Sequence, residues 1–129
     1  MVSKDLVAGL FTTLQNNEMV RNKEFVYSYS KLVVNVLKTL QRFGYIGTFE
    51  HIDDGRGGKV IIQLLGRINK AAPINPRFSV SYTDYEDWEK LYLPSRDIGI
   101  LVVTTNNGVM SHREAKEKRL GGKLLGYVW

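Results

Sequence analysis

The sequence of 129 residues contains no cysteine. This absence excludes disulfide frameworks, thiolate metal sites and cysteine nucleophiles, and it is typical of a protein of the reducing cytoplasm. Only three residues are proline. No apolar run approaches the roughly 20 residues of a membrane-spanning helix, since the longest uncharged one covers residues 98–103. The first residues also lack a basic segment followed by an apolar one, so we expect neither a secretory signal nor a membrane partner.

Histidine is scarce as well, with His51 and His112 as the only two. No His-x-x-x-His spacing and no cysteine accompany them, so the sequence predicts no metal site. Asp53 and Asp54 lie in a glycine-rich segment, where aspartate favours a turn for backbone reasons. The segment 55–58 lacks the spacing of a phosphate-binding loop. We therefore expect a protein that is not an enzyme and needs no cofactor; the catalytic alternative is a hydrolase using His51, Asp53 and Asp54.

Acidic residues are outnumbered, since 13 Asp and Glu face 18 Lys and Arg and leave a net charge of +5. Such a balance concerns partners rather than fold. The net charge becomes negative over residues 84–97, which contain five acidic residues. These residues could face a basic protein neighbour or only solvent. An acid-free stretch over residues 55–83 instead suits the phosphate backbone of RNA. Its basic residues are Arg56, Lys59, Arg67, Lys70 and Arg77. The alternative is a small basic protein-interaction module with an acidic partner.

Apolar residues make up 43% of the chain, which is ordinary for a globular protein. In the first half their spacing predicts two helices and three strands. Ser3 and Ser30 are the expected N-caps of the helices, and a glycine ends the second helix. The expected elements are a helix between Ser3 and Asn16-Asn17, a strand over 24–27, a helix between Ser30 and Gly44, and strands over 47–52 and 59–64 joined by a loop.

The second half predicts mainly strands. An alternating strand is expected over 77–82, and residues 85–91 are ambiguous, with a short helix as one option. Residues 98–105 form a β-rich run with the composition of a strand that is buried on both faces. Ser111 and Glu114 have the spacing of a capping box, so a helix is expected from there to Gly121-Gly122. An aromatic-rich strand over 123–129 closes the chain.

These elements predict an α+β fold of two small lobes. The N-terminal lobe has the order α-β-α-β-β and covers residues 1–68. The C-terminal lobe covers residues 77–129 and is β-rich with one helix. Residues 69–76, which include Pro73 and Pro76, form the expected linker.

A polar turn follows the apolar residues 98–103. Thr104, Thr105, Asn106 and Asn107 place four hydrogen-bonding side chains in a row, and Gly108 permits close approach of a backbone. Small hydroxyl and amide groups suit ribose 2′-hydroxyls and the shallow minor groove of RNA. The alternative is an ordinary strand end with an Asn-Gly turn.

The segment Gly99–Lys116 carries a longer pattern. A Gly is followed by two free positions, two aliphatic residues, a small hydroxyl residue and Thr; two free positions, Gly, two aliphatic residues, four free positions, a small residue and a basic one complete it. Every fixed position is met, and the pattern resembles that of the universal small-subunit ribosomal protein eight family. Four further segments resemble its archaeal and eukaryotic branch: Gly44–Gly47, Gly66–Lys70, Asn75–Phe78 and Gly121–Trp129.

This resemblance implies a ribosomal protein that is not an enzyme, located in the cytoplasm in the small ribosomal subunit. Members bind the central domain of small-subunit ribosomal RNA directly and help to form the platform of the subunit. The implied partners are one helix of that RNA and neighbouring small-subunit ribosomal proteins. Some bacterial members also bind their own messenger RNA, which makes this chain's messenger a further candidate partner.

Site residues follow by position from the resemblance and by chemistry from the sequence. The resemblance implies a main RNA-contacting loop at Thr104, Thr105, Asn106, Asn107 and Gly108, and a second contact at Ser30 and Lys31. By chemistry, basic side chains are expected to supply electrostatic affinity without reading sequence. These are Lys31, Arg56, Lys59, Lys70, Arg77 and Lys116.

Overall fold

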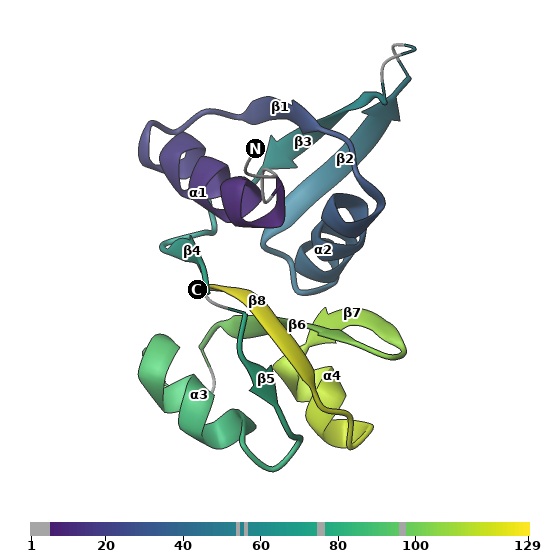
Figure 1. Cartoon of the computed structure of the whole chain (residues 1–129). Coiled ribbons are helices and arrows are strands. Elements are labelled where there is room, and N and C mark those ends of the chain that lie inside the picture. The colour runs from purple at the N-terminus through teal and green to yellow at the C-terminus, as the bar shows by residue number, and fades with distance from the viewer. Residues whose placement is uncertain (1–5, 54, 56, 75–76, 96–97) are drawn as a thin grey trace, which may run out of the picture.

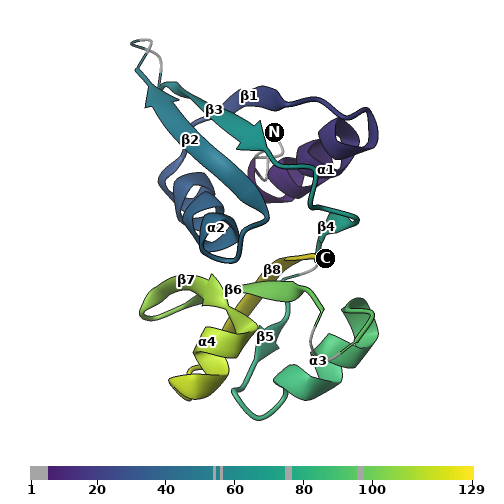
Figure 2. The same cartoon turned by 180° about the vertical axis from the view of Figure 1, so that it is seen from behind.

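The computed structural model describes residues 6–53, 55, 57–74, 77–95 and 98–129. Two lobes lie one above the other, each with helices and antiparallel strands (Figures 1 and 2). The predicted α+β class is therefore confirmed. The elements are α1 (Leu6–Met19), β1 (Glu24–Ser28), α2 (Lys31–Arg42), β2 (Ile46–Ile52), β3 (Lys59–Leu64), β4 (Ala71–Pro73), β5 (Ser79–Val80), α3 (Tyr85–Tyr92), β6 (Ile100–Thr105), β7 (Gly108–Ser111), α4 (His112–Glu117) and β8 (Gly122–Val128).

The first lobe is a three-stranded sheet with one face covered by two helices. Its strand order is β1-β3-β2, and both pairings are antiparallel. In the central strand β3, Val60, Ile62 and Leu64 are buried whereas Lys59 and Gln63 are exposed. This alternation turns one face of the sheet toward α1 and α2 and leaves the other to solvent.

The second lobe is built on the sheet order β4-β8-β6-β7, with β5 also pairing with β8. Residues 100–103 of β6 are all buried. Ile100 and Val102 belong to a core shared with the first lobe, and Leu101 and Val103 belong to a second core. The prediction that residues 98–105 are buried on both faces is thus confirmed for residues 100–103 only, because Ile98 is exposed and Thr104 and Thr105 are half-buried.

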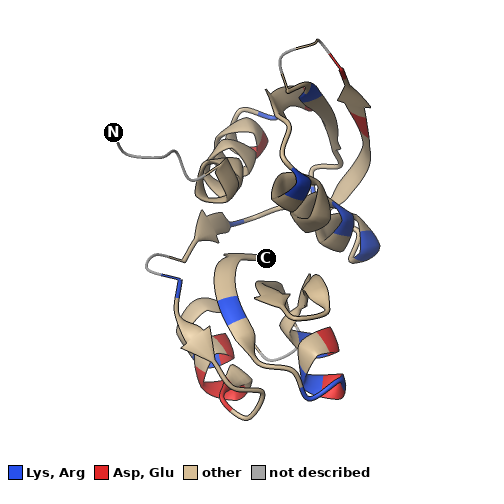
Figure 3. Cartoon of the chain, turned by 45° about the vertical axis from the view of Figure 1, so that its right-hand side comes forward, with Lys and Arg blue, Asp and Glu red and all other residues tan. Residues whose placement is uncertain are grey.

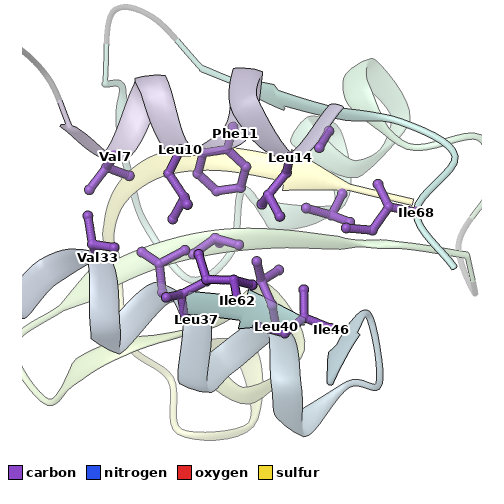
Figure 4. Close-up of a cluster of buried hydrophobic side chains, with 14 of the residues drawn as sticks. Val7, Leu10, Phe11, Leu14, Val33, Leu37, Leu40, Ile46, Ile62 and Ile68 are labelled. Atoms are coloured by element: carbon purple, nitrogen blue, oxygen red, sulfur yellow. The ribbon is translucent and has the colours of Figure 1, made fainter. Parts of the chain in front are cut away.

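The first core joins the two lobes. Figure 4 shows apolar side chains of α1 and α2 pointing toward one another and toward the strands. The same cluster takes in residues of the second lobe's sheet, which come from β4, β6 and β8. The buried contributors from that sheet are Ala71, Ile100, Val102, Leu125 and Val128.

The first helix differs from expectation at its end. The sequence predicts a stop at Asn16-Asn17, but α1 continues to Met19. Two contacts account for the extra turn: the Asn17 side chain donates to the Thr13 carbonyl (2.8 Å), and Glu18 Oε2 accepts from the backbone N–H of Ile68 (2.9 Å). The expected cap at Ser3 lies outside the described residues.

Within the described residues, the second lobe has two helices instead of the one expected, because residues 85–92 form α3. Tyr85 and Glu89 lie one turn apart and are both buried, so tertiary packing settles what the sequence left ambiguous. The capping box is confirmed, since Ser111 Oγ accepts from Glu114 N and the Glu114 carboxylate accepts from Ser111 N. Helix α4 nevertheless ends at Glu117, because Arg119 adopts a φ of 55°.

Three strands depart further from expectation. Strand β5 covers only Ser79–Val80 of the expected 77–82. Strand β7 was not expected; it pairs with β6 directly after the polar turn. Strand β4 lies within the expected linker and pairs with β8, with Ala71 opposite Val128.

A glycine on β8 allows α1 to approach the sheet. A Cβ built on Gly126 would lie 2.5 to 2.7 Å from ring carbons of Phe11, which is fully buried. We therefore expect Gly126→Val to lower the free energy of unfolding by about 1–3 kcal/mol through overpacking. Urea denaturation measures the change. The exposed Glu50→Val on β2 is the control, and equal stability of the two variants would contradict this packing.

Candidate nucleic-acid interface

The predicted polar turn lies at the tip of the hairpin formed by β6 and β7. Thr104 pairs with Val109, and Thr105 pairs with Gly108, so that Asn106 and Asn107 form the turn itself. Gly108 has a φ of 106°, a region that other residues rarely adopt. The turn therefore requires a glycine here for conformational reasons, whatever else approaches it.

The hydroxyl of Thr105 braces this turn. It accepts from the backbone N–H of Asn107 (3.1 Å) and donates to the Gly108 carbonyl (2.8 Å). Asn106 and Asn107 are exposed, and their amide groups make no hydrogen bond with a described residue. The backbone that carries the two amides is thus braced, and the amides still have all their donors and acceptors available.

A lysine that the sequence did not single out stands beside this hairpin. Lys123 on β8 is exposed and pairs with Thr104 on one side and with Ser79 on the other. These three residues help to line a depression of about 420 Å³. Its lining is polar and glycine-rich: Ser79, Val80, Thr104, Thr105, Asn106, Gly121, Gly122 and Lys123. We call residues 104–108 with Lys123 the hairpin cluster.

The second predicted contact lies where α2 begins. Ser30 is the N-cap, as predicted, and its Oγ accepts from Val33 N (3.1 Å). Lys31 is exposed in the first turn. Lys59 is exposed too, and it pairs with Ser28, two residues before the cap. We call Ser30, Lys31 and Lys59 the N-terminal cluster.

Helix α2 connects the two clusters. Near its C-terminal end, Thr39 Oγ1 donates to the Val109 carbonyl of β7 (3.4 Å), and Arg42 pairs with Glu114 of α4 (2.9 Å). Both views place α2 and the β6–β7 hairpin on the same side of the molecule (Figures 1 and 2). Helix α2 rises about 13 Å between Ser30 and Thr39. The two clusters are therefore close enough for a single RNA helix to contact both.

One of the predicted cations is already engaged inside the protein. Lys116 Nζ lies 2.5 Å from Glu89 Oε1, and Glu89 is only 5% exposed. The same oxygen lies 2.9 Å from Nε2 of His112. Lys116 therefore neutralises a buried carboxylate of α3. Because its charge is already paired, Lys116 is less suited to bind a phosphate.

The remaining predicted cations do not gather at one place. Lys59 is the first residue of β3, whereas Arg67 lies three residues beyond its last, so they stand at opposite ends of a strand roughly 17 Å long. Lys70 is exposed beside β4, and Arg77 is exposed just before β5. Arg56 lies outside the described residues. The acid-free stretch is therefore spread over both lobes, although Figure 3 shows Lys and Arg over α2 and β8 and acids over α3.

Sequence reasoning missed two cations at this interface. Lys38 is exposed on α2, seven residues after Lys31, so helical periodicity would have placed both on one face. Lys123 carries no such local signal. Only the pairing of β8 with β6 brings it to Thr104.

Neither a metal centre nor a hydrolytic site is indicated by the described part of the chain. The described residues contain no group of three or more His, Asp or Glu that could hold a metal ion. Asp53 accepts from Gly55 N (2.9 Å) in a local turn, and the His51 ring stacks on Tyr29. Asp54 lies outside the described residues. No helix in the described part is long and apolar enough to cross a membrane.

Exposed, uncharged amides beside a lysine, on a braced hairpin of a small basic protein, are typical of the RNA-binding class. The family model described as ribosomal protein S8 matches residues 5–129. Similar relatives are named small ribosomal subunit protein uS8. Those of Saccharolobus islandicus strain L.S.2.15, Saccharolobus solfataricus strain P2 and Pyrobaculum islandicum are 52%, 51% and 49% identical, over 100% of both chains in each case. The chain belongs to the ribosomal protein S8 family.

The buried histidine beside this interface predicts a pH effect on stability. His112 Nδ1 accepts from Leu101 N (3.0 Å), so the proton of the neutral ring lies on Nε2. Burial lowers the pKa of His112 from 6.5 to about 4; Glu89 opposes this, whereas Lys116 and Arg113 add to it. The unfolded chain takes up a proton near pH 6.5, which the folded chain resists until about pH 4.

Stability is therefore full above pH 6.5 and falls as the pH drops toward 4. We expect this group to remove up to about 3 kcal/mol over that range. Urea denaturation at several pH values measures the loss. In His112→Gln this share of the loss should be absent, and identical pH profiles of variant and wild type would contradict the assignment.

Proposed function

We propose that this protein binds the central domain of small-subunit ribosomal RNA directly and helps to assemble the platform of the subunit. Its family makes the chain a structural constituent of the small ribosomal subunit in the cytoplasm, not an enzyme. Small-subunit ribosomal RNA and ribosomal proteins are its partners. The observation that carries the RNA-contact proposal is the braced hairpin with its two exposed amides.

The two kinds of side chain at the interface have different tasks. Asn106 and Asn107 donate and accept, as ribose hydroxyls and base edges require, and Thr105 positions them. Lysine reads no sequence, because any phosphate satisfies it. We assign affinity to the exposed lysines of both clusters and of α2: Lys31, Lys38, Lys59 and Lys123.

Footprinting of small-subunit ribosomal RNA with the purified protein tests the proposal. Protection of one irregular helix of the central domain is the expected result. Protection elsewhere, or none at concentrations that saturate binding, would overturn it. The alternative of an acidic protein partner predicts that no RNA is protected.

The chain's own messenger RNA is a further proposed ligand. Such binding would use the same interface, so the messenger and the ribosomal RNA helix should compete. Competition between the two RNAs in one titration tests this. Simultaneous binding would show that the messenger is held elsewhere.

Removing one amide should affect cognate RNA alone. Asn106→Ala deletes donors and acceptors without changing charge or the Thr105 brace. We expect it to weaken binding of the protected helix by about 1–3 kcal/mol and to leave binding of an unrelated duplex unchanged. Lys59→Ala is the matched control, and it should weaken both RNAs alike. Equal losses on both RNAs for Asn106→Ala would mean that the hairpin is only a turn.

Binding should also depend strongly on salt. If about four to six phosphates are neutralised, affinity should fall on the order of 10²–10³-fold between 50 and 200 mM salt. Filter binding at a series of salt concentrations measures the slope. Lys31→Ala with Lys38→Ala should lower that slope by up to about two contacts. A slope unchanged by the double substitution would remove α2 from the interface.

A further inference from the structure

An aromatic stack stands next to the N-terminal cluster, and neither the family pattern nor the proposed contacts use it. The rings of Tyr29 and His51 lie with centroids 3.9 Å apart and planes within 15° of parallel. Tyr29 is half-buried, whereas His51 is exposed. The pair is thus a two-ring stack with Tyr29 inside and His51 outside.

The backbone of the first lobe fixes this stack. Tyr29 directly follows β1, and His51 is the penultimate residue of β2. These two strands flank β3, and Tyr27 and His51 each pair with Val60. The Tyr29 N–H donates to the Gly58 carbonyl (3.1 Å). Gly58 has a φ of 91°, and a Cβ there would clash with the His51 ring. The rings are therefore held in register by sheet pairing and by a glycine that makes room for them.

The surroundings suit a nucleotide better than an apolar partner. Tyr29 directly precedes Ser30 and Lys31, where α2 begins, and His51 is adjacent to Ile52, the strand partner of Lys59. A nucleotide bound here could place its phosphate against the lysines and stack its base on the exposed ring. Every base has a π-face, so such a platform needs no particular sequence.

We propose that His51, backed by Tyr29, is a stacking platform for an unpaired base of the bound RNA. This inference rests on the proposed function and adds a second kind of contact to it. The hairpin cluster supplies hydrogen bonds at one end of α2. The platform supplies stacking at the other end, with phosphates held by Lys31 and Lys59.

The experiment uses the full chain and the RNA helix that footprinting protects. 2-Aminopurine replaces each unpaired purine of that helix in turn, because its fluorescence is quenched when it stacks. His51→Phe keeps an aromatic face, and His51→Leu keeps apolar bulk without one. Thr48→Ala, an exposed position on the same strand, is the control. Thermal melting confirms that each variant is folded.

We expect one 2-aminopurine position to be quenched by the wild type, by His51→Phe and by Thr48→Ala, but not by His51→Leu. Affinity should fall roughly ten- to a hundredfold in His51→Leu only. Equal quenching and equal RNA affinity in His51→Phe and His51→Leu would overturn the platform. The proposed function would still stand. A wild-type protein that does not bind the RNA would overturn both.

Discussion

Burial of β6 and β8 on both faces is the constraint on which the rest of the structure depends. Alternate residues of β6 enter two different cores, one shared with α1 and α2 and one beneath α3 and α4. A strand in this position has no polar face to offer, which explains the unbroken apolar run at residues 100–103. It also makes the two lobes one packed unit, because Phe11 of α1 lies against Gly126 of β8. Both cores therefore pack against the same sheet.

The position of the hairpin cluster follows from this packing of β6. Residues of β6 are buried up to Val103, and the strand emerges at Thr104, where its side chains become available to a ligand. A hairpin that grows out of a doubly buried strand is held at its base by both cores. The backbone that carries its amides is therefore already ordered, and preorganisation of this kind would reduce the entropy lost in the proposed contact with RNA.

Local signals in the sequence were sufficient for much of the fold. Ser30 and the capping box at Ser111 depend only on side chains reaching nearby backbone groups, and both were predictable. Contacts between distant segments were not. Nothing local indicates that Lys123 pairs with Thr104 or that Lys116 pairs with Glu89. The candidate site was therefore predictable where it is one continuous turn, and incomplete where strand pairing assembles it.

The acidic residues of α3 and the basic residues of α2 lie on opposite sides of the molecule (Figure 3). Helix α3 lies on the opposite side from α2 and the β6–β7 hairpin (Figures 1 and 2), and its outer surface carries the exposed Glu86 and Asp87. Its third acid, Glu89, is internal and paired with Lys116, so it adds little to the outer field. Phosphates are attracted to the lysine-bearing side and repelled from α3. A net charge alone would attract RNA to any surface, whereas this separation favours the side that carries the amides, which is the side proposed to contact RNA.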